Sequence, residues 1–175
     1  MQEQQHIAIS PEKNLPTEIK EKKQRASSVL LLPGVSVGST FSYSLKAGYM
    51  NHRIGGYAKF KSNFTSKGDF VTGQINSNNY NGEMRIGRLS LLGGALIRTT
   101  NFLILYIGVG YGERWVQWEN HENQYVEIED FLNVGAEPEV GLIFTIHKFC
   151  IGGGVNCLIG KSTTLEGSLS IGFIF

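Results

Sequence analysis

Long hydrophobic runs are missing from this 175-residue sequence, in which no stretch approaches the ~18 consecutive apolar residues of a membrane-spanning helix. A strong charge of one sign is missing too, because the formal net charge is only +1. Such a chain has little electrostatic reason to bind nucleic acid, and we expect no nucleic-acid partner. The mean hydropathy of −0.10 suits a soluble protein, but also a membrane barrel in which only alternate residues face lipid. The length predicts a single folded domain.

Cysteine is nearly absent, with only Cys150 and Cys157 present. Both lie on one expected strand, on opposite faces and roughly 23 Å apart, which excludes a disulfide between them. The four histidines are scattered without the spacing of a metal site, at His6, His52, His121 and His147. We therefore expect no metal and no other cofactor.

Proline is scarce and glycine abundant, with four prolines against 22 glycines. Glycine weakens helices and permits the tight bends of a barrel. Near the C-terminus, apolar residues or glycine occupy every second position from Leu165 to Phe175, and small or polar residues fill most of the positions between them. A period of two gives a β-strand one apolar and one polar face. This pattern fits either a sandwich or a barrel.

The same alternation recurs from Val29 onward and predicts about eight strands. We expect them at residues 29–38, 41–50, 55–64, 85–99, 102–118, 131–146, 149–160 and 164–175. The links at 51–53, 100–101 and 147–148 are short, whereas those at 65–83 and 119–130 are long and polar. Short periplasmic turns opposite long external loops are typical of outer-membrane barrels. The predicted fold is therefore all-β: an antiparallel up-and-down transmembrane barrel with both termini in the periplasm.

Aromatic residues of the apolar parity gather near the expected strand ends, as in the two interfacial girdles of a membrane barrel. The outer girdle is predicted at Phe41, Tyr43, Tyr111 and Trp115, and the inner one at Tyr49, Phe144, Phe149 and Phe173. The final Phe175 resembles the terminal aromatic residue of outer-membrane proteins, where it belongs to the assembly signal. That resemblance implies the barrel-assembly machinery as a partner.

Charged residues fall on the opposite, inward parity, and we expect them to form an interior network. Its predicted members are Lys46, Lys59, Arg88, Arg114, Glu137, Glu139 and Glu166. Side chains fill the interior of an eight-stranded barrel, so the network predicts a charge-paired plug and not a pore. The short link at 100–101 places Arg88 opposite Gly112, with Glu137 on the other side of that glycine. The outward-facing Pro138 lacks an amide donor and predicts a local bulge.

Three motifs have a second, catalytic or nucleotide-binding interpretation. Glu137 and Glu139 could form a glycosidase pair, but a narrow barrel has no room for a substrate cleft. Residues 154–163 resemble a phosphate-binding loop with one residue too many between the glycines, and period-two alternation follows where a helix is required. The glycines at 108, 110 and 112 could suggest a dinucleotide-binding motif, but their spacing is wrong for it and no helix follows. They are better explained as space for large neighbouring side chains inside a barrel.

Residues 1–28 are polar, with prolines at positions 11 and 16, and we expect a tail or linker before a barrel domain at 29–175. An alternative is a signal peptide with residues 18–25 as its basic region and 28–39 as its apolar region. Pro33 and Gly34 interrupt that apolar run, and cleavage after it would delete a strand. We therefore expect that the export signal is not present in this chain.

Three segments together carry a family resemblance: LSLLGGALIRT at 89–99, FLILYIGVGYGERWVQWE at 102–119 and VGAEPEVGLIF at 134–144. They resemble the small eight-stranded outer-membrane barrels of the Bacteroidota type, which share the OmpA/OmpX-like architecture. The resemblance covers residues from about 29 to the end. It implies the barrel fold and a bacterial outer-membrane location, and it brings no catalytic residues.

Three functions remain open at this stage. The first is a non-enzymatic outer-membrane protein that contacts lipid and acts as an anchor, an accessory subunit or a surface-interaction module through loops 65–83 and 119–130. The second is a soluble calyx for a small apolar ligand, which requires the apolar face to point inward. The third is a surface enzyme, for which the sequence shows no nucleophile–base arrangement.

Overall fold

The computed structural model describes residues 27–67, 69–71, 80–120 and 123–175. Its strands are β1 (Ser28–Val37), β2 (Phe41–Asn51), β3 (Ile54–Ser62), β4 (Asp69–Val71), β5 (Tyr80–Arg98), β6 (Leu103–Asn120), β7 (Tyr125–Ile128), β8 (Asn133–Ala136), β9 (Glu139–Ile146), β10 (Phe149–Ile159) and β11 (Thr163–Ile174). A short 3-10 helix, η2, spans Glu129–Phe131. In the described residues, no helix is long and apolar enough to cross a membrane.

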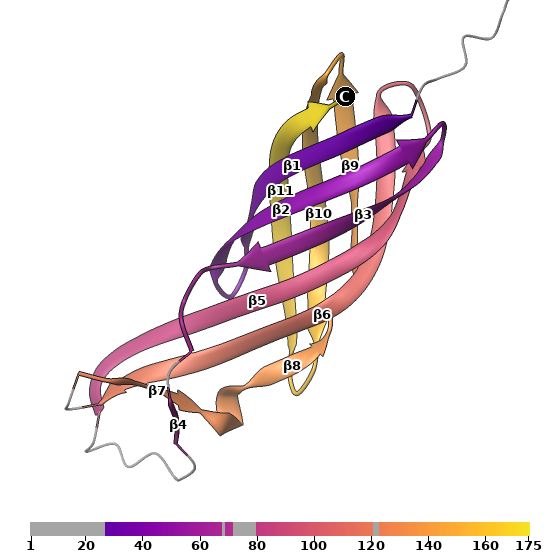
Figure 1. Ribbon diagram of the computed structural model, residues 1–175. Coiled ribbons are helices and arrows are strands. Elements are labelled where there is room, and N and C mark those ends of the chain that lie inside the picture. Colours follow the sequence, from indigo (N-terminus) through magenta and orange to yellow (C-terminus); the bar gives the residue numbers. More distant parts are fainter. Residues whose placement is uncertain (1–26, 68, 72–79, 121–122) are drawn as a thin grey trace, which may run out of the picture.

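The strands close into a tilted antiparallel barrel, as Figure 1 shows. β1 pairs with β2 on one side and with β11 on the other, where Leu30 lies opposite Ile174. β8 and β9 act as one strand, because both pair with β6 and β10 in the same register. A ring of eight strands results, which confirms the predicted fold. Closure leaves none of the eight with a free edge along the barrel wall.

The two ends of the barrel differ. Two hairpins, at His52–Arg53 and His147–Lys148, and the four-residue link 99–102 lie at one end, called here the turn end. The described N-terminal strand begins at this end, and β11 finishes there. The opposite end, the loop end, carries the longer connections, as the sequence predicts. Residues 1–26, expected as a tail, lie outside the described residues.

The strand boundaries differ from the expected ones mainly at the loop end. β5 begins five residues before the expected start at 85, and β6 extends to Asn120. The loops predicted at 65–83 and 119–130 contain β4 and β7, which pair with each other in parallel. The bulge predicted at Pro138 is wrong, because the register on both sides of it is unchanged. Cys157 still donates its amide N–H to the Pro138 carbonyl, at 3.0 Å. Pro138 therefore removes from the strand pairing only the hydrogen bond that its own missing N–H would have made.

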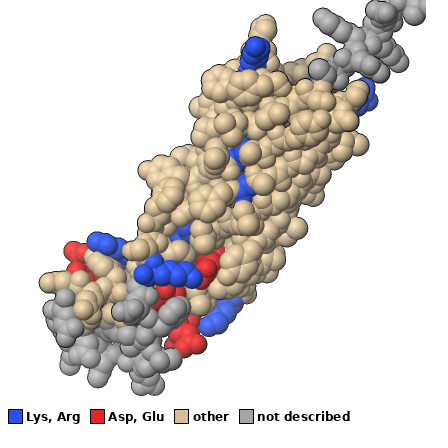
Figure 2. Space-filling view, in the orientation of Figure 1, with Lys and Arg blue, Asp and Glu red and all other residues tan. Residues whose placement is uncertain are grey.

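The outer wall is apolar over the middle of the barrel. Residues of one parity point outward, and Leu91, Ile107 and Leu169 expose 62%, 55% and 66% of their surface. Figure 2 shows this wall as a nearly uncharged belt. The inner parity divides in two: the half near the turn end holds a buried apolar cluster that includes Leu30, Leu96 and Ile143, and the half near the loop end is charged. An apolar exterior around a partly charged interior is the polarity of a membrane barrel.

At the loop end, β5 and β6 continue past the barrel and form a projection, the arm, together with β7 and β4 (Figure 1). Residues 63–67, called the strap, run from the end of β3 along the outward side of β5 and β6 toward β4. The Asn63 amide donates to the Arg88 carbonyl at 3.2 Å, and Gln117 donates its side-chain amide to the Ser66 carbonyl at 2.8 Å. The strap therefore covers residues of the arm that would otherwise be exposed.

Candidate functional site

The centre of the barrel interior holds a cluster of four fully buried ionic side chains: Lys61, Arg88, Glu137 and Glu166, called here the four-ion cluster. Arg88 contacts Glu137 at 2.8 Å and Glu166 at 2.9 Å. Lys61 pairs with the same two carboxylates, reaching Glu137 at 2.5 Å. Two cations and two anions balance, so the cluster carries no net formal charge.

Neutral groups complete the hydrogen bonding of this cluster. Asn156 donates its side-chain amide to Glu137 at 2.5 Å and to Glu166 at 3.0 Å. Ser90 donates its hydroxyl to Glu137 at 2.6 Å. Glu137 thus accepts from four side chains on three different strands, and these donors compensate the burial of its charge. This dense set of ion pairs and hydrogen bonds fixes how the strands around it are arranged.

A second group, the lysine–tyrosine cluster, lies nearer the turn end and consists of Lys46, Lys59, Glu139, Tyr57 and Tyr106. Lys59 contacts Glu139 at 2.6 Å and Lys46 contacts it at 3.5 Å. Two ammonium groups share one carboxylate here, and aromatic faces supply further compensation. The Lys46 Nζ lies 3.0 Å from the ring centroid of Tyr106 and 4.6 Å from that of Tyr57.

The structure brings six of the seven predicted interior residues into these clusters and leaves out the seventh. Arg114 shares the face of Arg88, its cross-strand partner, but makes no ion pair among the described residues. Lys61 was not predicted, although it has the same parity as Lys59 on β3. Glu137 and Glu139, considered above as a catalytic pair, are each bound by two cationic side chains. That arrangement fits a structural role for both carboxylates.

The predicted register between β5 and β6 is wrong by two residues. Arg88 lies opposite Arg114, and Gly112 lies opposite Ser90. The cause is the link after β5, which spans 99–102 and is held by amides of Thr99 and Thr100 to the Leu103 carbonyl. Gly112 nevertheless provides space for the pair, because a Cβ there would contact the Glu137 carboxylate and lie 3.1 Å from Arg88 Nη1.

The aromatic residues expected in the two girdles are exposed on the outer wall, except for one. The outward side chains of Phe41, Tyr43 and Tyr111 are exposed near the loop end, and Tyr49, Phe144, Phe149, Phe173 and Phe175 are exposed near the turn end. Trp115 is only 3% exposed, so its placement in a lipid-facing girdle is wrong. It lies on the arm beyond the cylinder, where its indole covers Gly87 and the strap residue Lys67 approaches to 5.2 Å from the ring centroid.

The outward side of the arm carries a second set of charges. Lys67 of the strap pairs with Glu113, and Glu127 of β7 is fully buried beside them. Burial raises the pKa of Glu127 above its usual value, the neighbouring Glu113 raises it further, and Lys67 opposes both. In the described residues, no three metal-ligating side chains come together.

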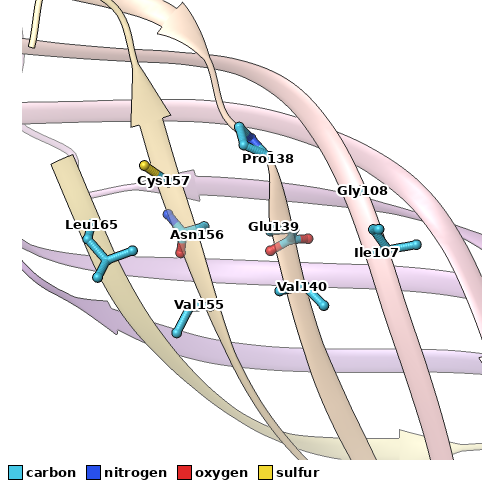
Figure 3. Close-up of a pocket in the computed structure, with 9 residues that line it drawn as sticks. All are labelled: Ile107, Gly108, Pro138, Glu139, Val140, Val155, Asn156, Cys157 and Leu165. Atoms are coloured by element: carbon cyan, nitrogen blue, oxygen red, sulfur yellow. The ribbon is translucent and has the colours of Figure 1, made fainter. Parts of the chain in front are cut away.

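The outer wall is hollowed beside Pro138, as Figure 3 shows. This depression of about 320 Å³ is lined by outward apolar side chains, among them Ile107, Val140, Val155 and Leu165. The hollow lies where β6, β9, β10 and β11 pass one another below Pro138. Its polar lining residues Glu139 and Asn156 are buried within the barrel, so the surface of the hollow is almost wholly apolar.

The closed ring, the apolar wall and the buried ion pairs define the fold of the small outer-membrane β-barrels of bacteria. Solved structures with this fold include Ail, the attachment invasion locus protein of Yersinia pestis, with a TM-score of 0.59 and 16% identity over 86% of this chain and 97% of that one. Another is the N-terminal barrel domain of Pseudomonas aeruginosa OprF, with a TM-score of 0.56 and 13% identity over 85% and 97% of the two chains. No protein-family model and no curated protein matches the sequence. At such low identity the likeness shows the fold alone.

Proposed function

We propose that this protein is an integral outer-membrane barrel without catalytic activity, closed by its ion clusters, which presents the arm and loops at the cell surface. The observation that carries the proposal is the polarity of the wall and the interior. Leu91, Ile107 and Leu169 face outward, whereas Arg88 and Glu137 are fully buried inside. A soluble calyx needs the reverse arrangement, so this observation favours the membrane protein.

The closed interior argues for an anchoring or surface-interaction role over transport. The four-ion cluster joins β3, β5, β11 and the segment between β8 and β9 across the lumen. Opening a path would separate ion pairs away from water, and breaking one buried pair costs about 3–5 kcal/mol. Because these interior side chains hold the barrel together, we assign the function of the protein to its outer surfaces.

The remaining assignments follow from the sequence and this orientation. The turn end faces the periplasm, and the arm and the loops at 65–83 and 119–130 contact other surface proteins. Phe175 takes part in recognition by the barrel-assembly machinery, and outer-membrane lipid surrounds the belt. The Bacteroidota type rests on the segments at 89–99, 102–119 and 134–144.

The proposal is tested by comparing full-length protein refolded into detergent micelles or phospholipid vesicles with the same protein diluted into plain buffer. Exposed apolar wall costs about 25 cal/mol per Å² in water, so aggregation is expected without lipid or detergent. In vesicles, a folded barrel should migrate differently on a gel before and after boiling. A folded, monodisperse protein in plain buffer would overturn the proposal and favour the calyx.

A further inference from the structure

The outward side of the arm holds the ammonium group of Lys67 between acidic and aromatic side chains. Lys67 pairs with Glu113, and its Nζ lies 5.2 Å from the ring centroid of Trp115. Glu127 of β7 lies on the same face, because it is the cross-strand partner of Gln117 on β6. Glu113, Trp115 and Glu127 are called here the arm site. Carboxylates and aromatic faces are the groups with which proteins bind alkylammonium ions.

The arm site has two carboxyl groups for one ammonium group. Glu127 is fully buried, and neither of its carboxylate oxygens accepts a hydrogen bond within the part of the chain that the structure describes. Burial raises the pKa of Glu127, Lys67 lowers it and Glu113 raises it, so the three charged groups interact. A buried carboxylate without donors is costly, and a bound cation would remove that cost. Lys67 satisfies Glu113 and leaves the site one cation short.

The group that occupies the arm site is exchangeable. The side chain of Lys67 is 44% exposed, whereas that of Glu113 is 9% exposed, so the cation lies on the solvent side of the pair. An ion pair whose cation is partly in water contributes little to stability. Rotation of the Lys67 side chain would free the Glu113 carboxylate and the indole of Trp115 without a change in strand pairing.

The backbone of the strap is strained next to this site. Phe64 has a φ angle of 58°, in the left-handed region that bulky side chains rarely adopt. Its ring is 72% exposed and lies 6.1 Å from that of Tyr43. Farther along the strap, side chains fasten it to the arm, through Gln117 to the Ser66 carbonyl and through Lys67. Such strain persists only where the surroundings enforce it, and it is common in segments that switch.

We propose that the arm site binds an alkylammonium group from outside the cell in exchange for the side chain of Lys67. The entering ammonium group pairs with Glu113, and its alkyl chain packs on the indole of Trp115. Glu127 favours a ligand that carries a second ammonium group. A small polyamine and a lysine side chain of a surface partner share this chemistry. The inference rests on the proposed function, since it requires that the arm faces the outside of the cell.

The test uses full-length protein in detergent micelles, titrated with spermidine at constant ionic strength and followed by isothermal titration calorimetry. Lys67→Ala should bind spermidine at least about tenfold more tightly than the wild-type protein, because the internal occupant no longer reduces the competent fraction. The matched control Lys161→Ala removes the same charge from an exposed position at the loop end and should leave the affinity unchanged. Glu113→Gln, added to Lys67→Ala, should abolish the gain.

The outcomes separate the possible failures. Gel migration before and after boiling shows whether each variant is folded, independently of binding. No gain in folded Lys67→Ala, or an equal gain in Lys161→Ala, would overturn the arm site. Failure of the wild-type protein to insert into vesicles would overturn the proposed function, whereas binding in micelles tests the arm site separately.

A second titration of Lys67→Ala, with N-acetyl-lysine methylamide, distinguishes the two sources of the ammonium group. Binding of this compound as well as spermidine would support the site and assign it to a lysine of a surface partner. Binding of spermidine alone would support the site and assign it to a free polyamine. Binding of neither compound would overturn the proposal.

Discussion

Arg88 of β5 and Glu137, just after β8, form a 2.8 Å ion pair inside the barrel, and neither side chain is exposed. Each also has a second partner of opposite charge, Glu166 for Arg88 and Lys61 for Glu137. The pair is thus part of a balanced set of four charges. Removal of one charge leaves an excess, whereas removal of one cation and one anion leaves Lys61 paired with Glu166.

The first prediction follows from that balance. Glu137→Ala should lower the free energy of unfolding by about 3–5 kcal/mol, because it leaves two buried cations with one carboxylate. Arg88→Ala combined with Glu137→Ala should cost less than the sum of the two single changes. Urea unfolding in lipid vesicles measures all three. Lys161→Ala, at an exposed site, should change the free energy by less than about 0.5 kcal/mol. Strictly additive effects would contradict the pairing.

The second prediction concerns Gly87 and Trp115 on the arm. A Cβ at Gly87 would overlap the indole of Trp115, so Gly87→Ala should destabilise the protein by roughly 1–3 kcal/mol. Gly167→Ala is the matched control, since a Cβ there meets nothing within 4 Å. Tryptophan fluorescence during urea unfolding measures both variants. Equal stability of the two would show that the arm is not packed as described.

The third prediction tests the lipid-facing wall at the middle of β6. Ile107 is 55% exposed on the outer wall, between the exposed aromatic rings near the two ends of the barrel. Ile107→Arg should destabilise the barrel by roughly 2–4 kcal/mol in a bilayer, whereas Ile107→Leu should be nearly neutral. The comparison is made by refolding into vesicles. If Ile107→Arg left the stability of the barrel unchanged, this face would be in contact with water and not with lipid.

The fourth prediction concerns the terminal residue. Phe175 is 68% exposed on the outward face at the turn end. Deletion of Phe175 should reduce insertion in cells more than it reduces stability of protein refolded in detergent, because the proposed role is recognition during assembly. Phe175→Tyr keeps an aromatic ring and serves as control. Assembly that survives the deletion would argue against the resemblance to an assembly signal.

How far the sequence predicts the structure depends on where the period of two holds. It holds along the barrel wall, because successive residues alternate between lipid and interior, and this alternation located Arg88, Glu137 and the exposed rings. It fails for Trp115, since a strap from a distant segment covers the outward face of the arm. Alternation does not reveal a covering segment.

Two other differences have local causes. The predicted register between β5 and β6 is wrong because the link between them has four residues, 99–102, and not two. Threonine and asparagine at 99–101 do not show from the sequence where the strand ends and the link begins. Lys61 was overlooked, although the run Lys59-Phe60-Lys61 contained the signal. Two lysines flanking an outward aromatic residue share the inward face, and their burial requires carboxylates opposite them.

The most direct test of the closed interior is the electrical conductance of wild-type protein in planar bilayers. The buried clusters around Arg88 and Glu139 fill the lumen, and ion passage would require separation of several buried pairs at once. We therefore expect the bilayer current to stay at baseline after insertion, which the gel assay establishes on the same sample. Steady, uniform conductance steps from the inserted wild-type protein would contradict the account.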